Sequence, residues 1–457
     1  MDSKSKLTIA KISKILKEND LTTANLIIDF LDKNSSNFSY FDLSKIAENA
    51  NGQRIQNSAY YTDEELLDLI YKDLPDFEKE KISILEPSVG VGNFLPYVFK
   101  KYSDKNVTID VVDIDNDSLL ILKKLLSLYS VPKNIKINFI NADFCALPLK
   151  KKYDLAIGNP PFSKVKKTYT SNFSKADYFN FESTNLASYF YEKCCNHCTY
   201  TCLVLPKNIL NTPEFSQTRS FLNKKNVQTI FDFGEKGFKG VLIETIYVKT
   251  NNSGASGQTK IYSYPKNKEI NQKQSYIFDE SLPYWIIYRN TEFDKIFYNM
   301  RFNIFDVFRD RQITNKLLKD KGSIKVIKSR NIRDDGTIIS IKGYDSFIDS
   351  CDLKNLAIYS FFDRDDVYLT PNMTYYPRVI KKEKGYIVNG SVAILLPKDN
   401  IVLTKDQMNF FASNEYRTFY QIARNYQTRS LNIDSSSVYF FGIREDWKWV
   451  GLKRKTL

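Results

Sequence analysis

The stretch ILEPSVGVGNFL, residues 84–95, decides the fold. It predicts a buried strand that ends at Glu86, a turn that carries Gly90 and Gly92, and a helix directly afterwards. Glycines in such a turn let the backbone approach a ligand closely, and the N-terminus of the helix favours a negatively charged group. A lone Gly-x-Gly turn also fits a dinucleotide, but Glu86 would repel a pyrophosphate and can receive a cationic ammonium or sulfonium centre. The turn is therefore interpreted as a site for a ligand with a positively charged centre.

Helices and short apolar strands alternate around this turn. We expect strands at residues 82–86, 107–112, 135–140, 155–158, 201–205, 229–233 and 244–249, with helices between most of them. This alternation is typical of a parallel, doubly wound α/β sheet, in which ligands bind at the carboxyl ends of the strands. The predicted fold class is α/β, with a Rossmann-like doubly wound sheet.

Three segments are expected, because 457 residues exceed what one hydrophobic core usually organises. Residues 1–50 carry two amphipathic helical patterns and form a helical lead-in, and residues 51–260 hold the doubly wound sheet. The loop TNNSGASGQTK ends this segment, and residues 261–457 form an α+β domain with a helix at residues 406–420.

The charge of the chain suits a polyanionic partner. The net charge is +13, and residues 281–457 contribute 29 basic and 20 acidic side chains to it. No apolar run approaches the ~20 residues that span a bilayer, and the start MDSKSK lacks the apolar stretch of a secretory signal. We therefore expect a cytoplasmic protein without a membrane partner.

Four of the six cysteines lie in the segment CCNHCTYTC, residues 194–202, which also holds the single histidine, His197. A zinc site is one reading of this cluster. Helical periodicity over residues 185–198 and a strand at 201–205 favour buried core cysteines instead. We predict no metal site and assign no catalytic role to His197.

Two further strands are expected to end in acidic residues. Asp113 follows the second strand, from where a carboxylate can accept both ribose hydroxyls of a nucleoside. Asp143 follows the third strand and can accept a hydrogen bond from an adenine amino group, with Phe144 against the ring. Together with Glu86, these residues predict a nucleoside cradle.

The motif Asn159-Pro160-Pro161-Phe162 directly follows the fourth strand. The amine of a purine is a poor nucleophile because its lone pair is delocalised into the ring. The side-chain oxygen of Asn159 and the carbonyl of Pro160 can each accept one N–H, which directs the lone pair toward an incoming methyl group. The two prolines hold these acceptors rigid, and Phe162 offers a face for an extruded base.

With these motifs in this order, residues 57–250 resemble the gamma class of DNA adenine-N6 methyltransferases of restriction-modification systems. The resemblance implies S-adenosyl-L-methionine as cofactor, a last sheet strand that is antiparallel, and a C-terminal target-recognition domain. The chain differs from the commonest pattern in having Phe162 where many members have tyrosine, and in its bulkier Val-Gly-Val-Gly turn.

The resemblance also assigns roles to residues. Glu86 would face the methionyl amine, Asp113 the ribose, and Asp143 with Phe144 the adenine. Catalysis would rest on Asn159, Pro160 and Phe162, and Phe238 would stack on the other side of the target base. The remaining cofactor-binding residues implied are Thr62, Ser88, Gly90, Asn93 and Ile114, with Asn159 also counted among them.

The predicted function is methylation of the N6 amine of a flipped-out adenine in double-stranded DNA, as the modification enzyme of a restriction-modification system. An RNA or protein-amide N-methyltransferase, a DNA cytosine-N4 methyltransferase, and a DNA-binding module that keeps the fold only as a scaffold are the alternatives. The basic residues Lys325, Lys328, Arg330 and Arg333 and the segment at residues 423–443 suit DNA contacts. A cognate restriction endonuclease is left open as a partner, and no nuclease motif is recognised in this chain.

Overall fold

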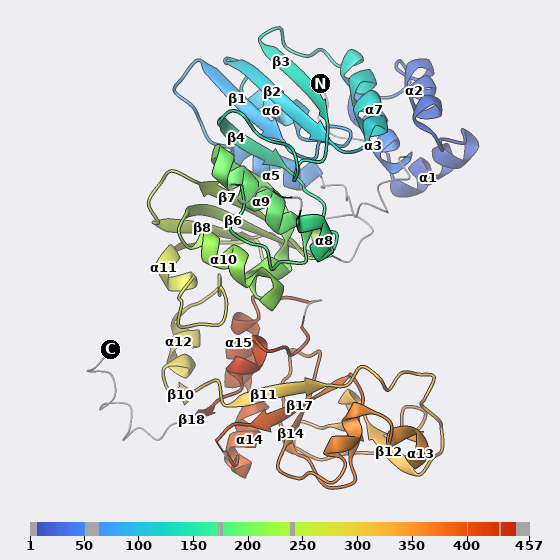
Figure 1. The fold of residues 1–457 in the computed structure, drawn as a ribbon, viewed down its shortest axis with the longest axis vertical. Helices are drawn as coiled ribbons and strands as arrows, with labels where there is room; N and C mark the ends of the chain where they lie inside the picture. Colours follow the sequence, from blue (N-terminus) through green and yellow to red (C-terminus); the bar gives the residue numbers. More distant parts are fainter. Residues whose placement is uncertain are drawn as a thin grey trace. The chain divides into compact units, whose positions relative to one another are not determined.

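The computed structural model describes residues 7–50, 64–171, 173, 177–237, 243–399, 401–428 and 431–444. Its contacts divide the chain into two units, of which Figure 1 draws the second in yellow to red except for a short green segment. The first unit comprises Met1–Ile209 and Glu214–Ser275, and the second comprises Leu210–Pro213 and Tyr276–Leu457.

The first unit is built on one nine-stranded sheet with the order β3-β2-β1-β4-β5-β7-β6-β8-β9. Strands β3, β2, β1, β4 and β5 run parallel to one another. Strand β7 is antiparallel to both β5 and β6, β8 is parallel to β6, and β9 is antiparallel to β8. The strands are β1 (Lys81–Glu86), β2 (Asn106–Asp113), β3 (Ile135–Asn141), β4 (Tyr153–Gly158), β5 (Cys198–Pro206), β6 (Asn226–Gly234), β7 (Thr245–Asn251), β8 (Gln258–Ser263) and β9 (Lys268–Lys273).

All seven strands expected from the sequence are present, and the antiparallel β7 is confirmed. Strands β8 and β9 extend the same sheet beyond the boundary expected at residue 260, so the first unit continues to Ser275. Apolar residues of β1, β2, β4 and β5 form the centre of its main core, among them Ile84, Ile109, Leu155 and Val204.

Helices cover this sheet and form the N-terminal region. They are α1 (Ile9–Glu18), α2 (Ala24–Lys33), α3 (Tyr40–Ala50), α5 (Glu64–Asp73), α6 (Leu95–Lys101), α7 (Asn116–Ser127), α8 (Lys167–Thr170), α9 (Leu186–His197), α10 (Ser216–Leu222) and α11 (Gln274–Ile277), the last of which straddles the boundary of the first unit. Helices α1 to α3 pack beside α7, where Ile27 and Leu31 share a hydrophobic cluster with Leu125 (Figure 1). The sequence predicted only two of these three helices, because the third buries the polar residues Asp42 and Ser44 and so lacks a clean apolar stripe.

The described residues of the second unit form three small sheets. Their orders are β11-β17-β14-β15, β13-β12-β16 and β10-β18. The strands are β10 (Met300–Arg301), β11 (Phe305–Arg309), β12 (Ile324–Ile327), β13 (Ser346–Ile348), β14 (Tyr368–Pro371), β15 (Ile380–Lys381), β16 (Ile387–Val388), β17 (Val392–Pro397) and β18 (Ile443–Arg444), and the helices are α12 (Thr291–Phe297), α13 (Ser350–Leu353), α14 (Lys405–Phe411) and α15 (Asn414–Ala423).

The single helix expected at residues 406–420 is wrong, because the segment forms two helices, α14 and α15. The side chain of Ser413 accepts a hydrogen bond from the backbone N–H of Tyr416 and so starts a new helix at that point. A local cap thus interrupts an apolar pattern that continues through the sequence.

Residues Leu210–Pro213 belong to the second unit although the first unit flanks them in the chain. The Leu210 carbonyl accepts a hydrogen bond from the backbone N–H of Trp285. The side-chain amides of Asn211 and Gln427 donate to each other's oxygens, at 2.5 and 3.2 Å. Both amides are buried, and this pair satisfies them reciprocally.

Among the residues that the structure describes, no helix is long and apolar enough to cross a membrane.

Candidate functional site

The carboxyl ends of β1 and β2 bring Glu86 and Asp113 to the same edge of the sheet. Both oxygens of Asp113 accept backbone hydrogen bonds, Oδ2 from the N–H of Gly90 at 2.8 Å and Oδ1 from the N–H of Asp115 at 2.9 Å. The first of these bonds fixes the glycine turn after β1 to the end of β2. The turn predicted from the sequence is therefore held by the acidic residue of the neighbouring strand.

The glycine turn contains two residues with left-handed backbone. Gly90 has φ +53° and Gly92 has φ +79°. A Cβ atom on Gly92 would lie 2.6 Å from Cδ1 of Leu122, whereas a Cβ on Gly90 would meet nothing within 4 Å. A side chain at position 92 would therefore have to displace Leu122 of α7, whereas Gly90 borders open space.

Glu86 is a buried carboxylate with an unsatisfied oxygen. Its side chain is 1% exposed, and its Oε2 atom has no hydrogen-bond partner among the described residues. Burial, and secondarily the charge of Asp113, raise the pKa of Glu86 well above its usual value. A cationic group beside Oε2 would satisfy this oxygen and stabilise the ionised carboxylate. Glu86 therefore fits the ammonium group of an amino-acid moiety.

The Asn159-Pro160-Pro161-Phe162 motif lies against the glycine turn. The Ser88 hydroxyl donates a hydrogen bond to the backbone carbonyl of Asn159 at 3.2 Å. At Gly158, directly before the motif, an added Cβ atom would lie 3.4 Å from Cδ of Pro87, so a larger residue at this position would contact Pro87. The structure thus brings the two motifs together although 71 positions separate Ser88 from Asn159.

The segment after the motif is anchored to the start of α9. The side chain of Asn185, which caps this helix, donates to the carbonyl of Phe162 at 3.2 Å. The Leu186 N–H donates to the carbonyl of Ser163 at 2.9 Å. The ring of Phe162 is partly buried and packs at the edge of the main core. These bonds fix the backbone on the carboxyl side of the motif.

Asp143 lies in the loop after β3 and also has both oxygens engaged. Its Oδ1 accepts from the Cys145 N–H at 2.9 Å, and its Oδ2 accepts from the Tyr169 hydroxyl at 2.6 Å. The neighbouring Phe144 is 2% exposed, and its ring lies 4.9 Å from that of Phe190. The structure therefore places Phe144 in the core and leaves its ring no exposed face.

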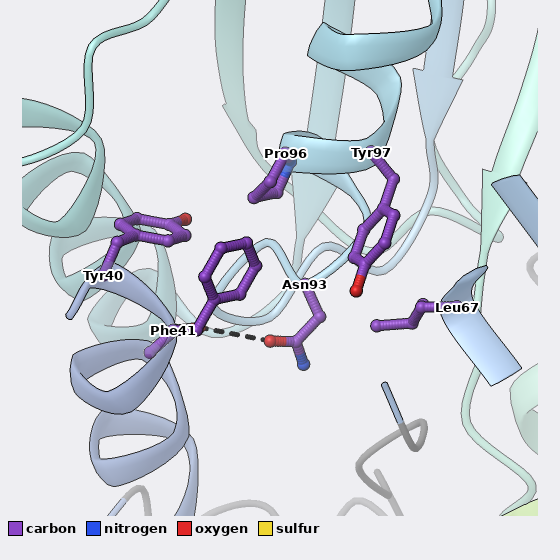
Figure 2. Close-up of a pocket in the computed structure, with 7 residues that line it drawn as sticks. Tyr40, Phe41, Leu67, Asn93, Pro96 and Tyr97 are labelled. Carbon is purple, nitrogen blue, oxygen red and sulfur yellow. Dashed lines mark hydrogen bonds between the residues drawn. The ribbon is translucent and has the colours of Figure 1, made fainter. Parts of the chain in front are cut away.

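Asn93 connects the glycine turn to the N-terminal helices. Its Nδ2 donates to Glu48 Oε2 at 3.0 Å, and its Oδ1 accepts from the Ser44 hydroxyl at 3.2 Å. Figure 2 shows Asn93 beside a cavity of about 10 Å³, which has room for roughly one water molecule. The cavity is lined by Tyr40, Phe41, Ser44, Leu67, Asn93, Pro96 and Tyr97. Helix α3 thus supports the end of the glycine turn.

The structure brings together Glu86, Ser88, Gly90, Asp113 and Asn159 at neighbouring strand ends. Ile114 is 64% exposed at the same edge, which leaves its side chain available to a ligand. Thr62 and Phe238 lie outside the described residues.

Sequence reasoning missed four residues that support the site. Ser44 and Glu48 hold Asn93, Tyr169 holds Asp143, and Lys193 holds the loop after Asp143. All four act across long separations in the chain, and no local pattern signals them.

In the second unit, Arg424 is 1% exposed, and its Nη2 donates to the Asn432 carbonyl at 3.3 Å. Arg424 is therefore part of the core, and its burial does not suit contact with DNA. Arg330 and Arg333 are exposed, and Lys328 and Arg330 both lie over the ring of Tyr344.

The cysteine cluster is part of the core. Cys194, Cys195, Cys198 and Cys202 are buried on α9 and β5, with free thiols. His197 pairs with Asp177 at 2.8 Å. Within the described part of the chain, no group of three or more His, Cys, Asp or Glu side chains could hold a metal ion.

Comparison with protein families gives one match over more than half of the chain. The model of the family described as "Eco57I restriction-modification methylase" matches residues 3–238. A curated relative, the type II methyltransferase M.CvrRI of Paramecium bursaria Chlorella virus XZ-6E, is 32% identical over 110 residues. This alignment spans 24% of the chain and 26% of the relative.

Two solved structures match parts of this chain at low sequence identity. The type IIG restriction endonuclease BpuSI is 13% identical with a TM-score of 0.48, and the match covers 89% of this chain and 61% of that one. The methyltransferase subunit of a type I restriction-modification system from Streptococcus thermophilus is 15% identical with a TM-score of 0.42, over 50% of this chain and 53% of the other.

Proposed function

Because the chain belongs to the Eco57I restriction-modification methylase family, we propose that it methylates the N6 amine of a flipped-out adenine in double-stranded DNA. S-adenosyl-L-methionine is the cofactor, and it supplies an electrophilic methyl group on a sulfonium centre. The proposal concerns the substrate, the target atom and the residues that act on it.

One observation carries the proposal, the hydrogen bond from the Ser88 hydroxyl to the Asn159 carbonyl at 3.2 Å. This bond joins the first residue of the Asn159-Pro160-Pro161-Phe162 motif (the target-amine motif) to the glycine turn after β1 (the cofactor turn). The acceptors for the target amine in this proposal are the Asn159 side-chain oxygen and the Pro160 carbonyl. Such fixed acceptors act without a general base, because they orient the amine lone pair before the methyl group transfers.

The cofactor-binding roles follow from the surroundings of each carboxylate. The unsatisfied Oε2 of Glu86 binds the methionyl ammonium group. Asp113 accepts the ribose hydroxyls through lone pairs that its two backbone donors leave over. Asp143 accepts a hydrogen bond from the 6-amino group of the adenine, and the exposed Ile114 side chain covers the ring.

DNA binding belongs to the same proposal. Phe162, and Phe238 on the far side, stack on the extruded base, while exposed basic residues of the second unit such as Arg330 and Arg333 contact the duplex. A cognate restriction endonuclease would complete the system.

The test is transfer of labelled methyl from S-adenosylmethionine to unmethylated genomic DNA, followed by nucleoside analysis. N6-methyladenine supports the proposal, whereas N4-methylcytosine, or label found only in RNA or protein, contradicts it.

The matched control is Asn159→Ala, which we expect to abolish methyl transfer and to leave the cofactor Kd within about twofold, because Asn159 acts mainly on the target amine. A loss of cofactor binding as large as the loss of activity would contradict its role as an acceptor.

A further inference from the structure

The loop after β3 is held by donors that come from the chain beyond the target-amine motif. Lys193 on α9 is fully buried, and its ammonium group donates to the carbonyls of Phe144 at 3.0 Å, Cys145 at 3.1 Å and Leu147 at 2.6 Å. The Tyr178 hydroxyl donates to the Cys145 carbonyl at 2.9 Å. These donors fix the backbone of the loop, and none of these bonds is made to the side chain of Asp143.

Tyr169 is different, because its hydroxyl donates to the Asp143 carboxylate itself, at 2.6 Å. The other carboxylate oxygen accepts from the Cys145 N–H at 2.9 Å. With one donor on each oxygen, the carboxylate cannot rotate without losing a hydrogen bond. The directions of its remaining lone pairs are therefore fixed.

The position of Tyr169 is itself fixed by packing. Its ring lies 5.0 Å from that of Phe173, and Phe173 stacks on Tyr178 at 5.0 Å. The Val165 N–H donates to the Thr184 carbonyl at 2.8 Å, which closes the base of the segment that carries Tyr169. Burial and the hydrogen bond to Asp143 raise the pKa of Tyr169, so its hydroxyl stays protonated and remains a donor.

We propose that Tyr169 is a positioning residue that keeps Asp143 oriented as an acceptor and thereby makes the cofactor site select a 6-amino purine over a 6-oxo purine. The inference rests on the proposed function, in which Asp143 accepts from the cofactor adenine. A 6-oxo group would direct its own lone pair at an oriented carboxylate, and two acceptors repel each other. Without the Tyr169 hydroxyl, the carboxylate rotates more freely and the selection weakens.

The test compares S-adenosylhomocysteine with its deaminated form, S-inosylhomocysteine, by calorimetric titration of the full chain. Wild-type protein should bind the amino form more tightly. Tyr169→Phe should reduce this preference by about tenfold, as expected when a hydrogen bond to a charged group is lost. Tyr178→Phe removes a hydroxyl that donates to the backbone of the same loop, and it should leave the preference unchanged.

A preference unchanged in Tyr169→Phe overturns the inference, and so does an equal loss of affinity for both ligands, because that pattern indicates a purely structural role. In an Asp143→Asn background, adding Tyr169→Phe should change the preference no further, and a further full tenfold change would contradict a role through Asp143. If wild-type protein binds neither ligand, the proposed cofactor site fails and the inference fails with it. If wild-type protein binds the amino form, the proposed cofactor site stands, and only the role of Tyr169 is then in question.

Discussion

The side-chain hydroxyl of Ser88 donates a hydrogen bond to the backbone carbonyl of Asn159 at 3.2 Å, and so ties the glycine turn to the first residue of the Asn159-Pro160-Pro161-Phe162 motif. The bond places Ser88 between the two substrates of the proposed reaction. A residue in this position can affect the alignment of the reaction without contributing much to the affinity for either substrate.

Replacing Ser88 by alanine should therefore lower kcat by about fivefold, with a small change in cofactor affinity, because one hydrogen bond of about 1 kcal/mol is lost from the motif. Ser88→Thr keeps a hydroxyl and should restore most of the rate. Single-turnover methyl transfer and cofactor titration check both values. A change confined to cofactor affinity would show that Ser88 acts only on the cofactor.

Cofactor affinity should depend on pH through Glu86. The pKa of this carboxyl is raised, so at lower pH it is protonated and does not attract an ammonium group. Affinity for S-adenosylhomocysteine should rise as the pH rises through the pKa of Glu86, and Glu86→Gln should bind weakly with a flatter profile. Methylthioadenosine lacks the ammonium group and should show no such rise. The same pH dependence for both ligands would contradict the assignment of Glu86.

The two glycines of the turn should differ in their effect on stability. Gly92→Ala should lower the free energy of unfolding by about 2–4 kcal/mol, since it adds an overlap with Leu122 to the strain of left-handed backbone. Gly90→Ala meets no neighbouring atom and should cost about 1 kcal/mol from backbone strain alone. Chemical denaturation measures both. Equal losses would show that the Leu122 contact relaxes freely.

The free energy of unfolding should fall as the pH rises and Glu192 loses its proton. Burial raises the pKa of this carboxyl from 4.5 to about 7, although the backbone N–H groups of Phe179 and Asn180 donate to it and oppose the shift. The folded protein thus holds a proton that the unfolded chain releases. This contribution to stability is complete below pH ~4.5 and is lost as the pH rises to ~7.

Glu192→Gln removes the titrating group and keeps a hydrogen-bond acceptor. Its stability relative to wild type should therefore increase between pH 4.5 and 7, measured by urea denaturation at several pH values. Parallel stability profiles of the two proteins would show that Glu192 does not bind a proton in this range.

The parallel strands could be predicted because strands covered on both faces are continuous apolar runs, as in KISILE and NVTIDVVD. Strand β9 could not, because KEINQK lies at the edge of the sheet and carries no apolar run. Strand β8 alternates between exposed and buried positions, but a loop-like stretch precedes it and hides its start. The sheet therefore runs past residue 260, where the sequence predicts a loop.

The positions of Glu86, Asp113 and Asn159 could be predicted, because each of these residues lies at or directly after the end of a strand. Burial could not be predicted for Phe144, because its sequence position does not say whether the ring points to the ligand or to Phe190. Tyr169 is not predictable from local sequence, because its partner Asp143 lies 26 residues earlier and on another loop.

The pairing of Asn211 with Gln427 constrains how the two positions can change in evolution. The chain passes from one unit to the other at residues 209/210, 213/214 and 275/276, so the second unit is not a single terminal piece. A recombination event that exchanged everything after residue 275 would replace the residue at position 427 but keep Asn211. The buried amide of Asn211 would then face a side chain from another protein. Descendants that acquire a foreign C-terminal half should therefore retain glutamine at 427, or change both positions together.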